Sequence, residues 1–219
     1  MIPKVILLFV IACSAANVAA QSSVDEMGEM LVHHFLTDVT TMQGSFEQSL
    51  IDADGTVVEV TSGTLEIERP VRFRWSYSEP YEQWLIADGL NVWSYDLDLQ
   101  QVTVKPQRDA LANTPALLLG GAKDALAQFN FGGTTVDEVT TWVRLEPKDE
   151  NSGFKRIELG FIDGKLMRMM FFDHLQQTTL IALHGVTINE PIDAERFEFS
   201  APAGVDVVGV PITTDAADF

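Results

Sequence analysis

The chain has 219 residues, of which 46% are hydrophobic, and its 32 acidic against 14 basic side chains give a formal net charge of −18. An acidic excess of this size argues against nucleic acid as a partner and against electrostatic docking on anionic lipid headgroups. The length fits one sizeable domain, and no repeat, low-complexity tract or Gly/Ser/Pro-rich linker divides it.

The first twenty residues have the pattern of an export signal. Lys4 precedes an apolar run over residues 5–12, and small residues then lead to Ala20 before Gln21. This is the order of a cleavable signal peptide, so we expect residues 1–20 to be removed and residues 21–219 to form a single domain outside the cytoplasm. The apolar run is too short to be a convincing membrane span.

The single cysteine leaves an alternative open. Residues 10–14 loosely match the acylation box of bacterial lipoproteins, in which the cysteine, here Cys13, becomes the lipidated first residue. A short apolar run precedes Cys13 and a better cleavage site follows it, which favours simple cleavage. The mature chain then has no disulfide, no thiolate nucleophile and no cysteine metal ligand.

The segment after the signal predicts a helix followed by many short strands. Ser23 and Glu26 have the spacing of a capping box, and apolar residues recur at helical spacing over residues 24–37. From Ser45 onward, apolar runs alternate with Asp-Gly and Ser-Gly pairs that are typical of hairpin turns. We expect a sheet of about ten strands.

Large rings gather in the first group of strands, between residues 69 and 96. They recur with a period of two, which is the pattern of a strand with one apolar face. Such a face either fills an ordinary core or lines a cavity, and we predict a cavity because few helical segments are available to cover the sheet. The residues assigned to it are Phe73, Trp75, Tyr77, Trp84, Ile86, Trp93 and Tyr95.

The second group of strands is more apolar than the first. Over residues 165–172, strict alternation places Leu166, Met170 and Phe172 on one face, and Met167, Met169 and Phe171 on the other. A strand that is apolar on both faces must be covered on both sides. One strongly curved antiparallel sheet with helices on its concave side satisfies this pattern, although alternation alone does not say which face lines the cavity.

No catalytic or metal-binding constellation is recognisable. His33 and His34 are adjacent, so on a helix they point about 100° apart and cannot share one metal ion. The chain has no HExxH spacing, no GxSxG elbow and no Gly-rich phosphate loop. We therefore predict a protein without catalytic residues, metal or cofactor.

Motifs that occur in order from about Phe46 to Val207 resemble the periplasmic lipoprotein carrier family of Gram-negative bacteria, LolA. They are SFEQ at 45–48 with SGTL at 62–65, ERP-VRFRW-Y-EP at 68–80, ADGLNVWSYDLDLQQVTV at 87–104, NTPALLL at 113–119 and DAERFEFSAPAGVDV at 193–207. The resemblance implies an α+β fold: an incomplete, open antiparallel β-barrel with a helical lid on its concave side.

The resemblance also implies a latch and a lid. The arginine of the RP pair, Arg69, would bond to the lid helix and keep it closed; the alternative is a surface arginine paired with Glu66 or Glu68. An arginine bonded to backbone carbonyls gives a closure weak enough for cargo to displace. The lid helix would comprise Thr114, Pro115, Ala116, Leu117, Leu118 and Leu119.

By the same resemblance, the expected function is that of a monomeric periplasmic chaperone. It would receive acylated lipoproteins from an inner-membrane ABC transporter and deliver them to an outer-membrane acceptor. The alternative is a membrane-anchored acceptor of similar fold, acylated at Cys13; a sensor with an added domain and a lipid-active hydrolase are more distant rivals. We expect residues 213–219, an acidic tail without apolar pattern, to be disordered.

Overall fold

The computed structural model describes residues 7–111 and 126–213, with side chains over residues 20–110 and 126–213. In this part of the chain, twelve strands form one sheet in the order β12-β6-β5-β4-β3-β2-β1-β11-β10-β9-β8-β7. The strands are β1 (Thr41–Ile51), β2 (Val57–Glu68), β3 (Arg72–Glu79), β4 (Gln83–Ala87), β5 (Asn91–Asp96), β6 (Gln101–Pro106), β7 (Phe129–Asp137), β8 (Thr140–Pro147), β9 (Phe154–Ile162), β10 (Lys165–Asp173), β11 (Thr178–Ile188) and β12 (Asp206–Val208).

The sheet is strongly curved and not closed, because β7 and β12 are its two edges. Neighbouring strands are antiparallel except for β12, which runs parallel to β6. The predicted open antiparallel barrel is therefore confirmed, with one short parallel strand added at an edge. The predicted lid residues 114–119 lie outside the described residues.

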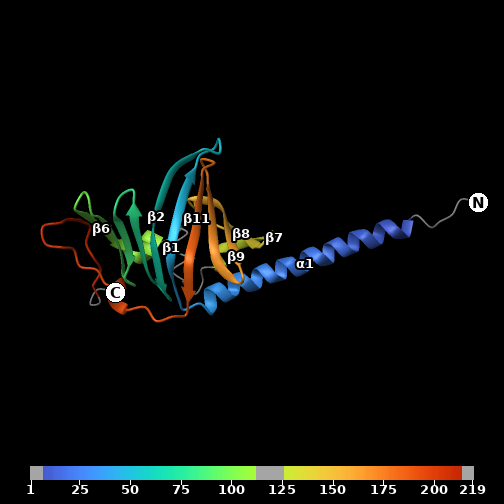
Figure 1. Cartoon of the computed structure of the whole chain (residues 1–219), viewed down its shortest axis with the longest axis horizontal. Helices are drawn as coiled ribbons and strands as arrows, with labels where there is room; N and C mark the ends of the chain where they lie inside the picture. Colours follow the sequence, from blue (N-terminus) through green and yellow to red (C-terminus); the bar gives the residue numbers. More distant parts are fainter. Residues whose placement is uncertain (1–6, 112–125, 214–219) are drawn as a thin grey trace, which may run out of the picture.

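The helices described are α1 (Leu7–Thr37), α2 (Gln107–Leu111) and the short 3-10 turns η1 (Leu126–Gln128) and η2 (Ala194–Phe197). Figure 1 shows α1 passing beneath the β7–β9 end of the sheet, while its N-terminal half projects away from the body. Among the described residues, no helix combines the length and the apolar character needed to cross a membrane.

The start of α1 corrects one prediction. The helix ends at Thr37 as expected, but it begins at Leu7 instead of residue 24. The Ser23 hydroxyl donates to the Ala20 carbonyl, at 2.8 Å, and so does not cap the helix. The preceding residues are rich in alanine, the strongest helix former, so the helix extends through them.

The contacts of α1 with the sheet include a clamp on the backbone of Thr134 in β7. The Asp25 carboxylate accepts from the Thr134 N–H at 2.8 Å, and the Gln21 amide donates to the Thr134 carbonyl at 3.2 Å. Two helix turns after Gln21, Gly28 lies so close that an added Cβ would clash with the Thr134 side chain. Gln21, which forms part of this clamp, is the residue that follows the predicted cleavage point.

The C-terminal segment covers the outer, convex face of the sheet. Phe199, Ala201 and Val205 pack on an apolar cluster formed by β4, β5 and β6. At one end of this segment Arg196 pairs with Glu66, at 2.7 Å. The segment therefore supplies the second layer that the apolar residues of the convex face require.

We expect Asn91→Ala to loosen the other end of this segment. The Asn91 side chain is buried, donates to the Ile212 carbonyl at 2.9 Å and accepts from the Ile212 N–H at 2.7 Å. Loss of both bonds should lower the free energy of unfolding by about 1–2 kcal/mol. Limited proteolysis with mass spectrometry should show faster cleavage of the C-terminal segment than in Asn151→Ala, a substitution in an exposed turn; equal cleavage would contradict the expectation.

Candidate functional site

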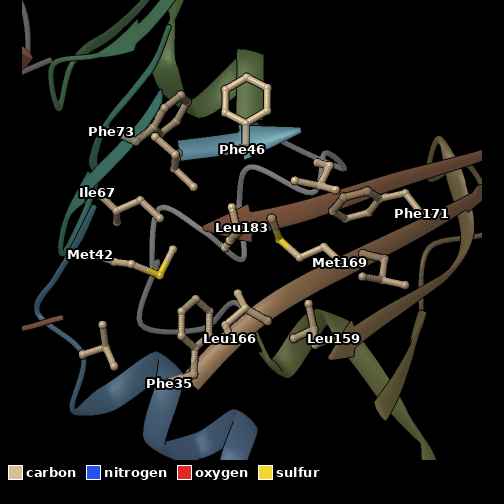
Figure 2. Close-up of a cluster of buried hydrophobic side chains, with 14 of the residues drawn as sticks. Phe35, Met42, Phe46, Ile67, Phe73, Leu159, Leu166, Met169, Phe171 and Leu183 are labelled. Atoms are coloured by element: carbon tan, nitrogen blue, oxygen red, sulfur yellow. The ribbon is translucent and has the colours of Figure 1, made fainter. Parts of the chain in front are cut away.

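The concave face of the sheet holds one continuous apolar cluster. It is built from both halves of the sheet and from the C-terminal half of α1, and Figure 2 shows side chains converging from these elements. Its centre includes Val32, Phe35, Met42, Phe46, Leu65, Ile67, Phe73, Trp75, Leu159, Phe161, Leu166, Met169, Phe171, Ile181 and Leu183.

Aromatic rings form the part of this cluster contributed by β1 and β3. The Phe46 ring lies edge-on to Trp75 and Tyr77, with centroid distances of 5.1 and 5.2 Å, and Trp75 stacks on Tyr77 at 6.4 Å. Edge-to-face and stacked rings at these distances attract one another beyond the burial of their area. Phe46 was missed by the sequence reasoning, although it lies in the SFEQ motif.

The seven residues assigned to one apolar face do not share a face. Phe73, Trp75 and Tyr77 belong to the concave cluster, whereas the other four lie on the convex face beneath the C-terminal segment. The reason is the register, because residues directly opposite each other in an antiparallel pair share a face. Trp75 pairs with Leu85, and the residue opposite Trp84 is Ser76. The four residues that lie on the convex face, and not on the concave face as predicted, are Trp84, Ile86, Trp93 and Tyr95.

A β-bulge corrects the alternation expected for β10. The pairing of β10 with β9 shifts between Leu166 and Arg168, so one extra residue enters the strand. Leu166 therefore joins Met169 and Phe171 on the concave face instead of lying opposite to them. On the other face, the Arg156 guanidinium lies 3.7 Å from the Phe172 ring centre and covers it.

Arg69 joins the end of β2 to the end of α1. Its Nε donates to the Val39 carbonyl at 2.8 Å, and its guanidinium lies 4.7 Å from the centre of the Phe35 ring. Burial lowers the pKa of Arg69 to about 10, so the group is still charged at neutral pH. The two carboxylates of the alternative pairing have other arginine partners, because Glu66 pairs with Arg196 and Glu68 with Arg72.

Two grooves open near the concave cluster. One, of about 780 Å³, lies between α1 and β7, with Met30 and Phe131 on its walls and Glu26 and Glu29 at its side. The other, of about 440 Å³, lies near the start of β2. Its lining consists of Gln48, Glu59, Thr61, Tyr77, Glu79, Pro80, Tyr81, Gln83, Asp96, Asp98 and Leu99.

The chemistry of this site is that of binding. In the described ranges, no group of three or more His, Cys, Asp or Glu side chains is placed to hold a metal ion. Large rings, thioethers and branched aliphatic chains form a surface that accepts apolar groups of varied shape without polar cost. The arrangement therefore favours binding of flexible apolar groups.

Comparisons with known proteins agree with this geometry. The family model "Outer membrane lipoprotein carrier protein LolA" matches residues 37–200. The outer-membrane lipoprotein carrier protein of Methylobacillus flagellatus is 38% identical, over 80% of this chain and 85% of that protein. The outer-membrane lipoprotein carrier protein of Halorhodospira halophila is 42% identical, over 79% of this chain and 81% of that protein. A solved structure of an uncharacterized conserved protein from Thermus thermophilus shares the fold, with a TM-score of 0.52 at 14% identity, covering 84% of this chain and 97% of that one.

Proposed function

The chain belongs to the outer membrane lipoprotein carrier protein family, LolA, and on this premise we propose that it is a periplasmic chaperone that binds the acyl chains of lipoproteins. The observation that carries the proposal is the continuous apolar cluster on the concave face. Each methylene group buried there contributes about 0.8 kcal/mol. An unselective apolar surface can therefore hold a multiply acylated protein firmly, and such a carrier needs no catalytic group.

The acyl chains would bind against Phe73, Trp75 and Tyr77, together with Phe46 and the concave face of β10, on which Met169 lies. In the empty protein these side chains pack on one another, on α1 and on the opposite half of the sheet. Cargo must therefore replace contacts that the protein makes with itself. We propose that cargo also displaces a lid helix comprising Thr114–Leu119, as the LolA resemblance implies; these residues lie outside the described part of the chain.

Transfer between membranes requires that neither the empty nor the loaded state be too stable. An inner-membrane ABC transporter would load the protein, and an outer-membrane acceptor would unload it by offering a more favourable apolar surface. A closed empty state that is only moderately favourable suits this exchange, because a ligand shifts an equilibrium only by its differential affinity. The protein would act as a monomer.

Maturation would remove residues 1–20. The clamp on Thr134 begins at Gln21, and in Figure 1 the helix before it extends away from the sheet. Cleavage after Ala20 would thus leave the clamp on the body intact. Acylation at Cys13 would instead keep the protein on a membrane and favour the acceptor as the alternative function.

The experiment that tests the carrier is co-purification from the periplasm with mass spectrometry of the bound cargo. We expect triacylated lipoprotein in a one-to-one complex, and a mature chain that starts at Gln21. Transfer of a test lipoprotein from inner-membrane vesicles to the purified protein provides the second readout. Empty protein that extracts no lipoprotein would make the concave cluster an ordinary core, and a lipidated Cys13 would favour the acceptor.

A further inference from the structure

The groove near the start of β2 has unused hydrogen-bonding capacity at its floor. Thr61 lines the groove and is only 9% exposed, and its buried Oγ1 has no hydrogen-bond partner among the described residues. The Tyr77 hydroxyl, also in the lining, donates a long hydrogen bond of 3.5 Å to Gln48. Buried polar side-chain atoms are nearly always paired, so an unpaired one marks a place where a ligand can supply the partner.

A second unpaired donor lies beside this groove. Trp75 is 7% exposed, and within the part of the chain that the structure describes its buried Nε1–H has no acceptor; its ring stacks on the ring of Tyr77. Gln48 and Thr61 are opposite each other in the β1–β2 register, and Tyr77 is opposite Gly63 on the next strand. Polar groups from three adjacent strands thus lie at the border of the aromatic cluster.

The rim of the same groove is acidic. Its lining includes Glu59, Glu79, Asp96 and Asp98, and no lysine or arginine is among the lining residues. Carboxylates so placed repel a phosphate group that approaches the floor. Carbonyl oxygens of esters and amides carry no charge and accept hydrogen bonds, which matches the unpaired donors.

We propose that this groove is the subsite for the uncharged ester linkages of the acylated cargo, and that its acidic rim rejects lipids with anionic headgroups. The proposal rests on the carrier function and adds to it a means of selection. The linkages would contact Thr61, Tyr77 and Trp75, while the acyl chains continue from there into the apolar cluster around Phe46. Phospholipids with similar acyl chains would bind more weakly, because the acidic rim repels their phosphate groups.

The hydrogen-bonding part is tested with two lipopeptides and one variant. The probes are an uncharged peptide with an N-palmitoylated, dipalmitoylglyceryl cysteine, and its analogue in which ether linkages replace both esters. Thr61→Val removes one hydroxyl at nearly constant shape, so we expect it to weaken binding of the ester probe about fivefold. The ether probe should bind wild type and variant within about twofold, because it lacks the ester carbonyl acceptors.

The charge part is tested with phosphatidylglycerol that carries two palmitoyl chains. We expect Glu59→Gln/Glu79→Gln to raise its affinity at least about fivefold at low salt while leaving the uncharged ester probe within about twofold. The matched control is Glu26→Gln/Glu29→Gln, which removes the same charge beside the other groove and should leave both affinities near wild type.

The outcomes separate this proposal from the carrier function. The subsite is refuted, and the carrier function stands, if the wild-type protein binds the ester probe but Thr61→Val weakens binding of both probes equally. The same holds if the two charge variants bind phosphatidylglycerol with equal affinity. If the wild-type protein binds neither lipopeptide, the carrier function itself is contradicted.

Discussion

Replacing Arg69 with leucine is expected to leave the mature protein loaded with lipoprotein and to slow delivery to an acceptor about thirtyfold. Arg69 donates to the Val39 carbonyl and lies over the Phe35 ring, so it holds the end of α1 against the end of β2. A charged hydrogen bond and a buried cation–π contact together are worth about 2 kcal/mol or more. Loss of that amount changes an equilibrium by about thirtyfold.

The direction follows from which state loses the contact. If Arg69 acts as the proposed latch, its contacts are lost when cargo binds and regained when cargo leaves, and this regain favours release. Without Arg69 the empty state is less favourable while the loaded state is nearly unchanged, so cargo is retained. Delivery is measured as transfer of a labelled lipoprotein from the purified complex to outer-membrane vesicles, and retention as the lipoprotein that co-purifies.

The matched control for this latch is Arg72→Leu. Arg72 pairs with Glu68 and lies 5.6 Å from the Phe197 ring centre, so this control also removes an arginine that lies beside an aromatic ring, close by in the chain. It should deliver cargo at nearly the wild-type rate. Arg69→Lys should be intermediate, because lysine keeps the charge but not the planar fork. Equal delivery by all four proteins would show that Arg69 only stabilises the fold.

The strands could be predicted from the sequence because their signals are local. Ile157, Leu159 and Phe161 alternate with residues that point the other way, and all three are buried in the concave cluster. Hairpin positions such as Asp163-Gly164 also follow from adjacent residues, and both have a positive φ. Local patterns therefore predicted a strongly curved antiparallel sheet, while its open edges were implied by the LolA resemblance.

The assignment of side chains to faces failed where it depended on pairing between strands. Nothing local in residues 83–87 says whether Trp84 or Leu85 faces the same way as Trp75; the β3–β4 register decides, and it selects Leu85. The bulge in β10 has the same character, since one extra residue exchanges the faces of all residues on one side of it. The start of α1 was missed because the alanine-rich segment before Gln21 is itself a good helix former.

Pairing across strands also leads to the expectation that Gly63→Ala will be strongly destabilising. Gly63 lies in β2 opposite Tyr77, next to a shift in the β2–β3 register. A Cβ at this position would lie 1.9 Å from the Ser76 carbonyl oxygen and within 3 Å of two further backbone atoms of β3. Backbone atoms cannot turn aside as a flexible side chain can, so the two strands must separate locally. We expect a loss of about 3 kcal/mol or more.

Urea denaturation measures this loss as a lower midpoint with an unchanged slope. The matched control is Gly153→Ala, because a Cβ added at Gly153 meets no atom within 4 Å. Its free energy of unfolding should be within about 0.5 kcal/mol of the wild-type value. Because Gly63 is opposite both Phe46 and Tyr77, separation of the strands would also displace the aromatic cluster. The variant should therefore extract less lipoprotein than wild type even where it remains folded. Unfolding of Gly63→Ala at the wild-type midpoint would mean that β2 and β3 are not held as closely as this register requires.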